Sequence, residues 1–120
     1  MKHTDISLIV NEQVKAYNNR DLSAFLSYYS NNIVVWIENK DKPIIEGKEQ
    51  LRVHFSELFE NSPFLHAEIL SERVMDSNVL HQERVVGRND HPASTILDVN
   101  YTVNDGLIQC VEFYNIQLDE

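Results

Sequence analysis

Apolar residues recur with one spacing in the first half of the chain and with another in the second half. Ile6, Ile9, Val10, Val14 and Tyr17 lie three or four positions apart, which is the period of a helix with one buried face. After His66 the pattern becomes that of extended chain. Helices are therefore expected to cover one face of a sheet, in an α+β fold.

Three helices are expected in the first part of the chain. They cover residues 6–17, DLSAFLSYY at 21–29 and KEQLRVHFSELFE at 48–60. Thr4 or Asp5 is suited to cap the first helix and Asp21 the second, because their side-chain oxygens accept hydrogen bonds from the first free backbone N–H groups. The short run IVVWI, rich in β-branched residues, predicts a strand between the second and third helices.

Two turn sequences divide the second part of the chain into hairpins. They are DSN at 76–78 and NDG at 104–106, and both contain residues that favour tight turns between strands. Strands joined by such turns run antiparallel. The prediction is three helices, all in the N-terminal part, packed on a mostly antiparallel sheet.

Composition and charge limit the partners of the chain. A length of 120 residues with 42% hydrophobic content suits one domain over residues 1–120. The net charge of -9 repels a nucleic-acid backbone or an anionic membrane, and neither is expected as a partner. No apolar run approaches the roughly 20 residues of a membrane helix, and no signal peptide is expected. One cysteine, Cys110, fits a cytoplasmic protein.

Four segments, taken in order, resemble a known family. They are AYNNRDLSAFLSYYSNNIVV, IIEGKEQLRVHFSELFENSPFLHAEIL, VLHQERVVG and YTVNDGLIQCVEFY. The chain resembles the SnoaL-like branch of the nuclear-transport-factor-2-like superfamily, which includes ketosteroid isomerases, over roughly residues 5–116. The resemblance implies a sheet curved into a cone, a pocket inside the cone, and frequent dimerisation through the outer sheet face.

The resemblance also allows the isomerase residues to be checked one by one. Similar isomerases place a general-base aspartate where this chain has Ile37, an oxyanion-binding tyrosine at Gln13 and a protonated acid at Val99. Glu38 and Asp98 lie one residue away from two of these positions, and alternation along a strand points them to the opposite face. A ketosteroid isomerase mechanism is therefore not expected.

The hairpin at residues 69–85 carries the polar residues expected on the cone face. A three-residue loop DSN places Arg73 opposite His81 and Ser71 opposite Glu83. A two-residue loop that places Glu72 opposite Glu83 is disfavoured, because like charges then face each other. His81 and Glu83 are therefore predicted to face the cone, with Arg73 within reach of an ion pair with Glu83.

Several roles remain open for these side chains. Glu83 is a structural partner of Arg73, or else Glu83, or His81 oriented by it, is a general acid or base that faces a ligand. A third alternative turns His81 toward solvent. His54 on the third helix is a second acid or base, or a packing residue. The five histidines show no local HxH or HxxxH spacing, so neither a metal site nor a cofactor is expected.

The resemblance directs a set of residues toward the pocket, where they serve as ligand contacts or as ordinary core. They are Gln13, Tyr17, Tyr29, Trp36, Phe55, Phe59, Arg73, Val99, Tyr101, Val111 and Phe113. Pockets for small molecules are commonly apolar and aromatic with a few polar groups.

Two functions follow for a domain of this kind. The first is a small-molecule-binding domain whose apolar and aromatic pocket takes an apolar or carbonyl-bearing ligand. The second is a cofactor-independent isomerase, cyclase or hydratase that uses His81 and Glu83, with His54 as a further candidate, for proton transfer on a small carbonyl compound. A homodimer through the outer sheet face is expected, with Leu97 or Ile108 as apolar contacts.

Overall fold

Residues 3–89 and 93–119 are described by the computed structural model, and they form three helices and six strands. The elements follow in the order α1 (His3–Asn18), α2 (Leu22–Ser27), β1 (Tyr29–Ile37), β2 (Ile45–Glu46), α3 (Lys48–Asn61), β3 (His66–Met75), β4 (Asn78–Val86), β5 (Ser94–Asn104) and β6 (Leu107–Asp119). The predicted α+β fold is confirmed.

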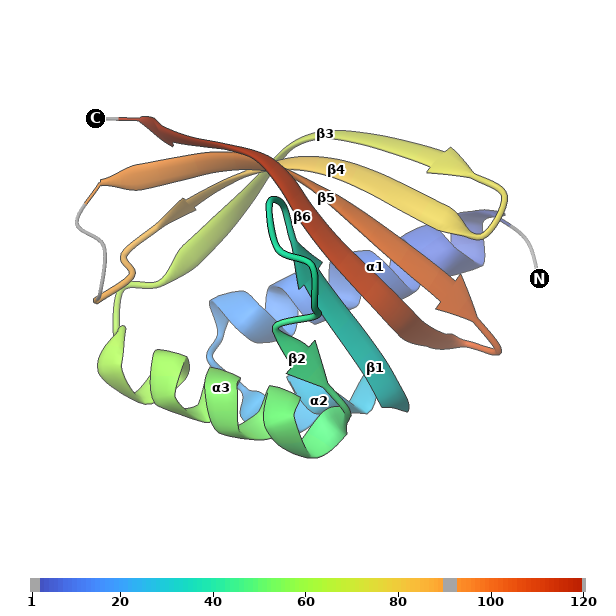
Figure 1. Cartoon of the computed structure of the whole chain (residues 1–120), viewed down its shortest axis with the longest axis horizontal. Helices are drawn as coiled ribbons and strands as arrows, with labels where there is room; N and C mark the ends of the chain where they lie inside the picture. Colours follow the sequence, from blue (N-terminus) through green and yellow to red (C-terminus); the bar gives the residue numbers. More distant parts are fainter. Residues whose placement is uncertain (1–2, 90–92, 120) are drawn as a thin grey trace.

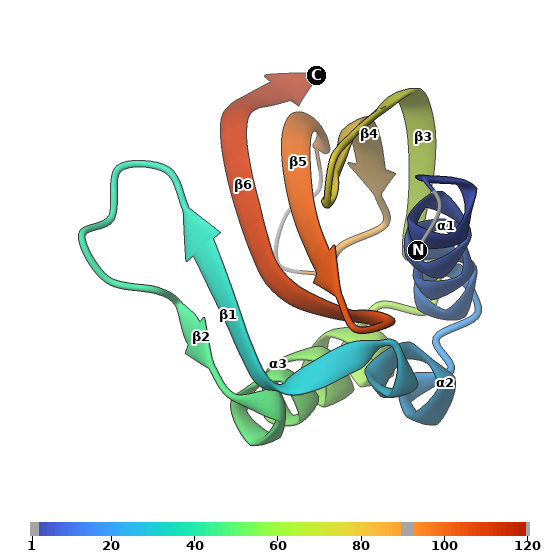
Figure 2. The same ribbon diagram turned by 90° about the vertical axis from the view of Figure 1, so that its right-hand side faces the viewer.

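The strands form one mixed sheet in the order β2-β1-β6-β5-β4-β3. All neighbouring strands are antiparallel except β1 and β6, which are parallel. Figure 2 shows the sheet curving, with α1 beside β3 and with α2 and α3 below the strands. The helices lie on the concave side, as Figure 1 also shows, so the space between helices and sheet is where a pocket forms.

The helix ends differ in part from the expected ones. α1 begins at His3, and the predicted cap at Thr4 or Asp5 lies outside the side chains that the structure describes. The prediction for α2 is confirmed, because the side chain of Asp21 accepts a hydrogen bond of 3.2 Å from the backbone nitrogen of Ala24. Tyr29, expected at the end of this helix, opens β1 instead, since it pairs with Ile108 of β6. Long-range strand pairing here overrides the local helical spacing.

The first hairpin has a shorter loop than predicted. Met75 pairs with Asn78, so the loop has two residues, and Asp76 adopts a φ of 53°. Aspartate tolerates this left-handed conformation better than most residues, which allows the tight turn. The NDG turn forms as predicted: Asn104 pairs with Leu107, and both residues between them have positive φ.

A register shift in β3 changes which side chains face the inside of the sheet. The pairs are Ile69 with Glu83 on one side of the irregularity and Ser71 with Gln82 on the other. The two-residue turn places Glu72 opposite His81 on the inner face, and the extra residue in β3 returns Ile69, opposite Glu83, to the same face. Arg73 pairs with Leu80 on the outer face, so the predicted register and the predicted Arg73–Glu83 ion pair are both wrong.

The outer sheet face differs from the expectation for dimer contacts. Leu97 is 9% exposed and Ile108 is fully buried in the core, so the prediction that either lies on the outer face is wrong. Neighbouring outer positions are polar, as in the hydrogen bonds from Asn100 to Glu112 and from Asn78 to Asn100. No helix among the described residues is long and apolar enough to cross a membrane.

A glycine fixes the end of β4. Gly87 has a φ of 80°, and a Cβ atom placed there would lie 2.1 Å from the carbonyl oxygen of Phe64. Only glycine fits such a close backbone approach. This contact holds the end of β4 close to the segment before β3. It thereby sets the position of Arg88, the next residue.

Candidate functional site

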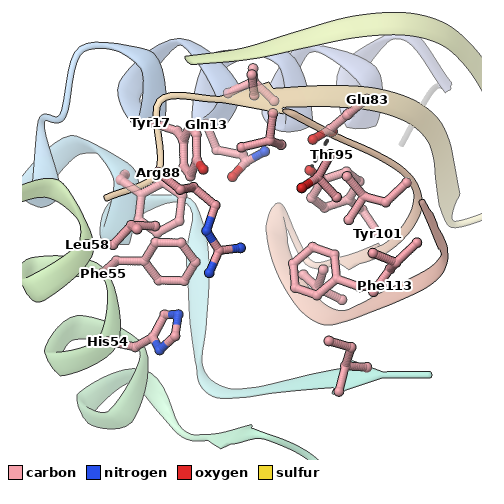
Figure 3. A pocket seen from close by; sticks show the side chains of 18 of the residues that line it. Gln13, Tyr17, His54, Phe55, Leu58, Glu83, Arg88, Thr95, Tyr101 and Phe113 are labelled. Carbon is pink, nitrogen blue, oxygen red and sulfur yellow. Dashed lines mark hydrogen bonds between the residues drawn. The ribbon is translucent and has the colours of Figure 1, made fainter. Parts of the chain in front are cut away.

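A cavity of about 450 Å³ lies between the helices and the inner face of the sheet. Its apolar lining consists of Val14, Tyr17, Phe25, Tyr29, Ile37, Ile44, Phe55, Leu58, Ala67, Val85, Leu97, Tyr101, Val111, Phe113, Ile116 and Leu118. Its polar lining consists of Gln13, His54, Glu83, Arg88 and Thr95. Figure 3 shows the labelled members of this wall, and most of the lining is aromatic or aliphatic.

Nine of the candidate site residues line this cavity. They are Gln13, Tyr17, Tyr29, His54, Phe55, Glu83, Tyr101, Val111 and Phe113. They come from α1, β1, α3, β4, β5 and β6, so the fold brings together residues that are far apart in the sequence.

Five other candidates lie outside the lining. Trp36 alternates with the buried Val35 and is on the outer face of β1, and Arg73 is on the outer face of β3. Phe59 packs behind the wall against the rings of Tyr17 and Phe25, with centroids 5.6 Å away in both cases. The other two, Val99 and His81, are buried on the inner face but do not line the cavity.

Aromatic rings from three helices form one side of the cavity. The ring of Phe25 lies 4.8 Å from that of Phe55 and 4.9 Å from that of Tyr29, measured between centroids. The ring of Tyr17 lies 6.2 Å from both Phe25 and Phe55. These tilted and edge-on contacts are the favoured geometry of aromatic pairs, so this side of the cavity is preformed and apolar.

Glu83 is a buried acid in the cavity wall. It is 5% exposed, and its Oε2 atom lies 2.8 Å from the hydroxyl of Tyr101 and 2.8 Å from Nδ1 of His81. Figure 3 shows the contact with Tyr101. The other carboxylate oxygen, Oε1, has no hydrogen-bond partner among the described residues. One acceptor of an otherwise satisfied carboxylate is therefore available to the cavity.

His81 lies behind Glu83, between two acids. Its side chain is fully buried, and Nδ1 and Nε2 lie 2.8 Å from oxygens of Glu83 and Glu72. Burial lowers the pKa of His81, but the hydrogen bonds and charges of Glu83 and Glu72 outweigh burial and raise this pKa above its usual value. The raised pKa favours the imidazolium form, in which both ring nitrogens donate hydrogen bonds to the two acids.

Glu72 continues this arrangement toward the surface. Its side chain is 28% exposed, and Oε1 accepts a hydrogen bond of 2.8 Å from the hydroxyl of Ser7 on α1. Burial raises the pKa of Glu72, but the hydrogen bonds from His81 and Ser7 outweigh it and lower this pKa overall. Glu72 therefore remains ionised and stabilises the charge on His81 from the side away from the cavity.

Two tyrosines complete the polar end of the cavity. Tyr29 donates a hydrogen bond of 2.6 Å to Oε1 of Gln13, which occupies the carbonyl of this buried amide. Burial, together with the charge of Glu83, raises the pKa of both Tyr29 and Tyr101 well above the usual value. Both hydroxyls therefore stay protonated and act as donors.

Arg88 supplies a cation to the cavity wall. It follows Gly87 at the end of β4, and Figure 3 shows its guanidinium directed toward the space beside Phe55, with Glu83 on the other side of the cavity. No sequence pattern indicated this role, because Gly87 and Asn89 beside Arg88 indicate only a turn. Thr95, Leu97 and Glu72 were missed as well. Glu72 was missed because the predicted loop of the first hairpin had three residues and the observed loop has two.

The three positions at which similar isomerases carry catalytic residues hold no acid in this chain. Ile37 and Gln13 line the cavity, and Val99 is in the core. Glu38 accepts hydrogen bonds from the backbone nitrogens of residues 115 and 116, and Asp98 accepts one from the side chain of Asn115. Neither acid lines the cavity. Among the described residues, no group of three or more His, Cys, Asp or Glu side chains is arranged to hold a metal ion.

Solved structures with the same fold support this architecture. An uncharacterised protein of cystatin fold from Novosphingobium aromaticivorans is 24% identical, with 92% of this chain and 97% of that chain covered and a TM-score of 0.82. A nuclear-transport-factor-2-like protein of unknown function from Cytophaga hutchinsonii is 13% identical, with 95% and 89% covered and a TM-score of 0.76. A proposed SnoaL-like polyketide cyclase from Jannaschia is 18% identical, with 92% and 85% covered and a TM-score of 0.76.

The sequence comparisons identify the family. No curated protein gives a significant match to the chain. The SnoaL-like domain family matches residues 10–111, which include the cavity-lining residues from Gln13 to Val111. The expected resemblance is thereby confirmed, and the chain belongs to the SnoaL-like domain family.

Proposed function

We propose that this domain binds a small, mainly apolar molecule inside the cavity and orients it through Glu83. The observation that carries the proposal is Oε1 of Glu83, which is available in a wall that is otherwise mostly apolar. The volume of about 450 Å³ is within the range of cavities that hold small molecules.

The surroundings of Glu83 favour a preorganised contact. Tyr101 and His81 both bond to Oε2, so the carboxylate is already held in place before a ligand enters. A hydrogen bond from a ligand to the carboxylate oxygen Oε1 would add to the affinity. The aromatic side of the cavity then supplies apolar contact area, while a hydrogen bond to Glu83 orients the ligand.

Ligand screening with a cavity-filling variant tests this proposal. Bicyclic aromatic and alicyclic compounds are screened by thermal shift, and hits are measured by isothermal titration calorimetry. Leu97→Trp places a larger side chain in the cavity wall, whereas Ile96→Trp adds the same group on the outer face of β5. Binding by the wild type and by Ile96→Trp, with loss in Leu97→Trp, is expected. Equal binding by all three proteins, or none, would contradict the proposal.

The acids around His81 favour a second candidate function, proton transfer on a small carbonyl compound. Oε1 of Glu83 would accept a proton from a carbon next to a carbonyl, and the electron pair of the broken C–H bond would move to the carbonyl oxygen as an enolate. In a β,γ-unsaturated ketone, return of the proton from Glu83 to the γ-carbon of the dienolate completes an isomerisation. Attack of an enolate carbon on a second carbonyl, with transfer of the proton from Glu83 to the alkoxide formed, completes a cyclisation. His81, backed by Glu72, would hold Glu83 in place through Oε2 while Oε1 accepts the proton.

Solvent exchange separates this second function from binding alone. The α-protons of 2-tetralone are followed by NMR in D2O with the wild type and with Glu83→Gln. General-base catalysis contributes roughly 10²–10⁴-fold to a rate, so the variant is expected to lose at least about 100-fold of the exchange rate above buffer. Exchange no faster with the wild type than with buffer would remove the catalytic candidate and leave the binding proposal intact.

A further inference from the structure

We infer that the ligand of this cavity presents an O–H or N–H hydrogen-bond donor to Glu83, rather than a carbonyl or carboxylate oxygen. The inference rests on the proposed binding function and specifies the chemical class of the ligand. It follows from the hydrogen bonds at Glu83, from the partners of the neighbouring polar groups, and from the place of Arg88 in the cavity wall.

Glu83 is held by hydrogen bonds at one of its two oxygens. Its Oε2 atom accepts a hydrogen bond of 2.8 Å from the hydroxyl of Tyr101 and lies 2.8 Å from Nδ1 of His81. Carboxylate oxygens accept hydrogen bonds, so the remaining oxygen, Oε1, offers an acceptor to the cavity.

The polar groups beside Glu83 already have partners within the protein. The Tyr101 hydroxyl donates to Glu83, and the carbonyl of Gln13 accepts a hydrogen bond from the hydroxyl of Tyr29. Oε1 of Glu83 is an acceptor that has no hydrogen-bond partner among the described residues. A ligand hydroxyl or amine satisfies this oxygen, whereas a ligand carbonyl would bring a second acceptor against it. A ligand carboxylate would add repulsion between like charges in an apolar surrounding.

The two ends of the cavity carry different polar groups. Arg88, a cation of the wall, lies across the cavity from Glu83 (Figure 3). The cavity is therefore polarised, with an acceptor at one end and a cation at the other. The net charge of -9 also favours the approach of an amine, since a charged cleft concentrates ligands of opposite charge.

A matched series of compounds on one scaffold tests the inference with the unaltered protein. The series is tetralin, 2-tetralol, 2-aminotetralin, 2-tetralone and tetralin-2-carboxylate, and each Kd is measured by isothermal titration calorimetry. Hydrogen bonds to charged groups contribute about 1.5–3 kcal/mol, so 2-tetralol and 2-aminotetralin are expected to bind about tenfold or more tightly than tetralin. The ketone and the carboxylate are expected to bind less tightly than 2-tetralol and 2-aminotetralin.

Two isosteric variants locate the source of the preference. Glu83→Gln offers both a donor and an acceptor, so the preference for 2-tetralol over 2-tetralone should disappear. Glu72→Gln removes an acid that touches His81 but does not line the cavity, so the preference should remain. Its loss in Glu72→Gln and retention in Glu83→Gln would overturn the inference.

The outcomes also separate this inference from the proposed function. If 2-tetralone or the carboxylate binds the wild type as tightly as 2-tetralol, the inference is wrong and the binding function stands. If no member of the series binds, including tetralin, the binding function itself fails and the inference fails with it. The wild-type ranking decides the matter even where a variant does not fold.

Discussion

His81 contacts most of the charged side chains at the polar end of the cavity. Glu83 on β4 and Glu72 on β3 face its two nitrogens, Tyr101 on β5 packs edge-on with ring centroids 5.4 Å apart, and Ser7 on α1 bonds to Glu72. A buried charge between two acids is stable only while all three groups keep their partners. Changes to any of them are therefore expected to be measurable in stability.

The raised pKa of His81 predicts how stability depends on pH. Because the folded-state pKa is above the unfolded value, protonated His81 contributes fully to stability below about pH 6.5. This contribution is lost as the pH rises through the folded-state pKa. Urea unfolding of the wild type from pH 6 to pH 9 should show the decline, and His81→Gln should show a smaller one. An identical pH dependence in both proteins would contradict this account of His81.

The hydroxyl of Tyr101 should contribute to stability through Glu83. Tyr101→Phe removes a 2.8 Å hydrogen bond to a buried carboxylate, which is expected to cost about 2 kcal/mol of unfolding free energy. Tyr114→Phe is the matched control, because Tyr114 lies on the outer face and makes no hydrogen bond through its hydroxyl among the described residues. Equal losses in the two variants, measured by urea unfolding, would show that the bond to Glu83 has no special role.

Among the elements, the β3–β4 hairpin does most to set the polar end of the cavity. Sequence alternation correctly placed His81 and Glu83 on one face of β4, because alternation within a regular strand depends only on local geometry. The partner strand could not be placed in the same way. The two-residue turn at Asp76 and Ser77 moved Glu72 inward and Arg73 outward, and a bulge beside Leu70 returned Ile69 to the inner face. Neither is visible as a break in the sequence pattern.

The end of β4 gives a prediction about backbone geometry. Gly87→Ala places a Cβ atom 2.1 Å from the carbonyl oxygen of Phe64, at positive φ, and is expected to destabilise the domain by more than about 2 kcal/mol. Gly106→Ala has a similar φ of 76° but nothing within 4 Å, so a loss of only about 1 kcal/mol is expected. Similar unfolding midpoints for the two variants in urea would show that the close contact with Phe64 does not determine the loss of stability.

For the whole molecule, the sequence predicted the fold better than it predicted the site. Helical spacing around Val10 and the turn at 104–106 were sufficient for the α+β order, and the family resemblance supplied the curvature. The cavity wall is harder to predict, since Arg88 and Thr95 enter it only through the path of the chain after β4. Leu97 was expected outside and lines the cavity, because the curvature of β5 and its register with Glu83 decide its direction.

A homodimer through the outer sheet face remains a prediction for the assembled molecule. Trp36 on β1 is a large, half-buried apolar group on that face, and Trp36→Glu is expected to lower the dimer fraction in light scattering after size exclusion. Leu8→Glu is the control, since Leu8 is a 60% exposed residue on α1, away from this face. A monomeric wild type, or equal loss of dimer in both variants, would contradict the prediction.

The orientation of a bound donor at Glu83 is the central claim, and a crystal structure of the domain with 2-tetralol tests it most directly. The account predicts that the ring system lies against Phe25 and Phe55 and that the hydroxyl oxygen lies about 2.5–3.0 Å from Oε1 of Glu83. A ligand outside the cavity, or one whose hydroxyl points away from Glu83, would contradict it.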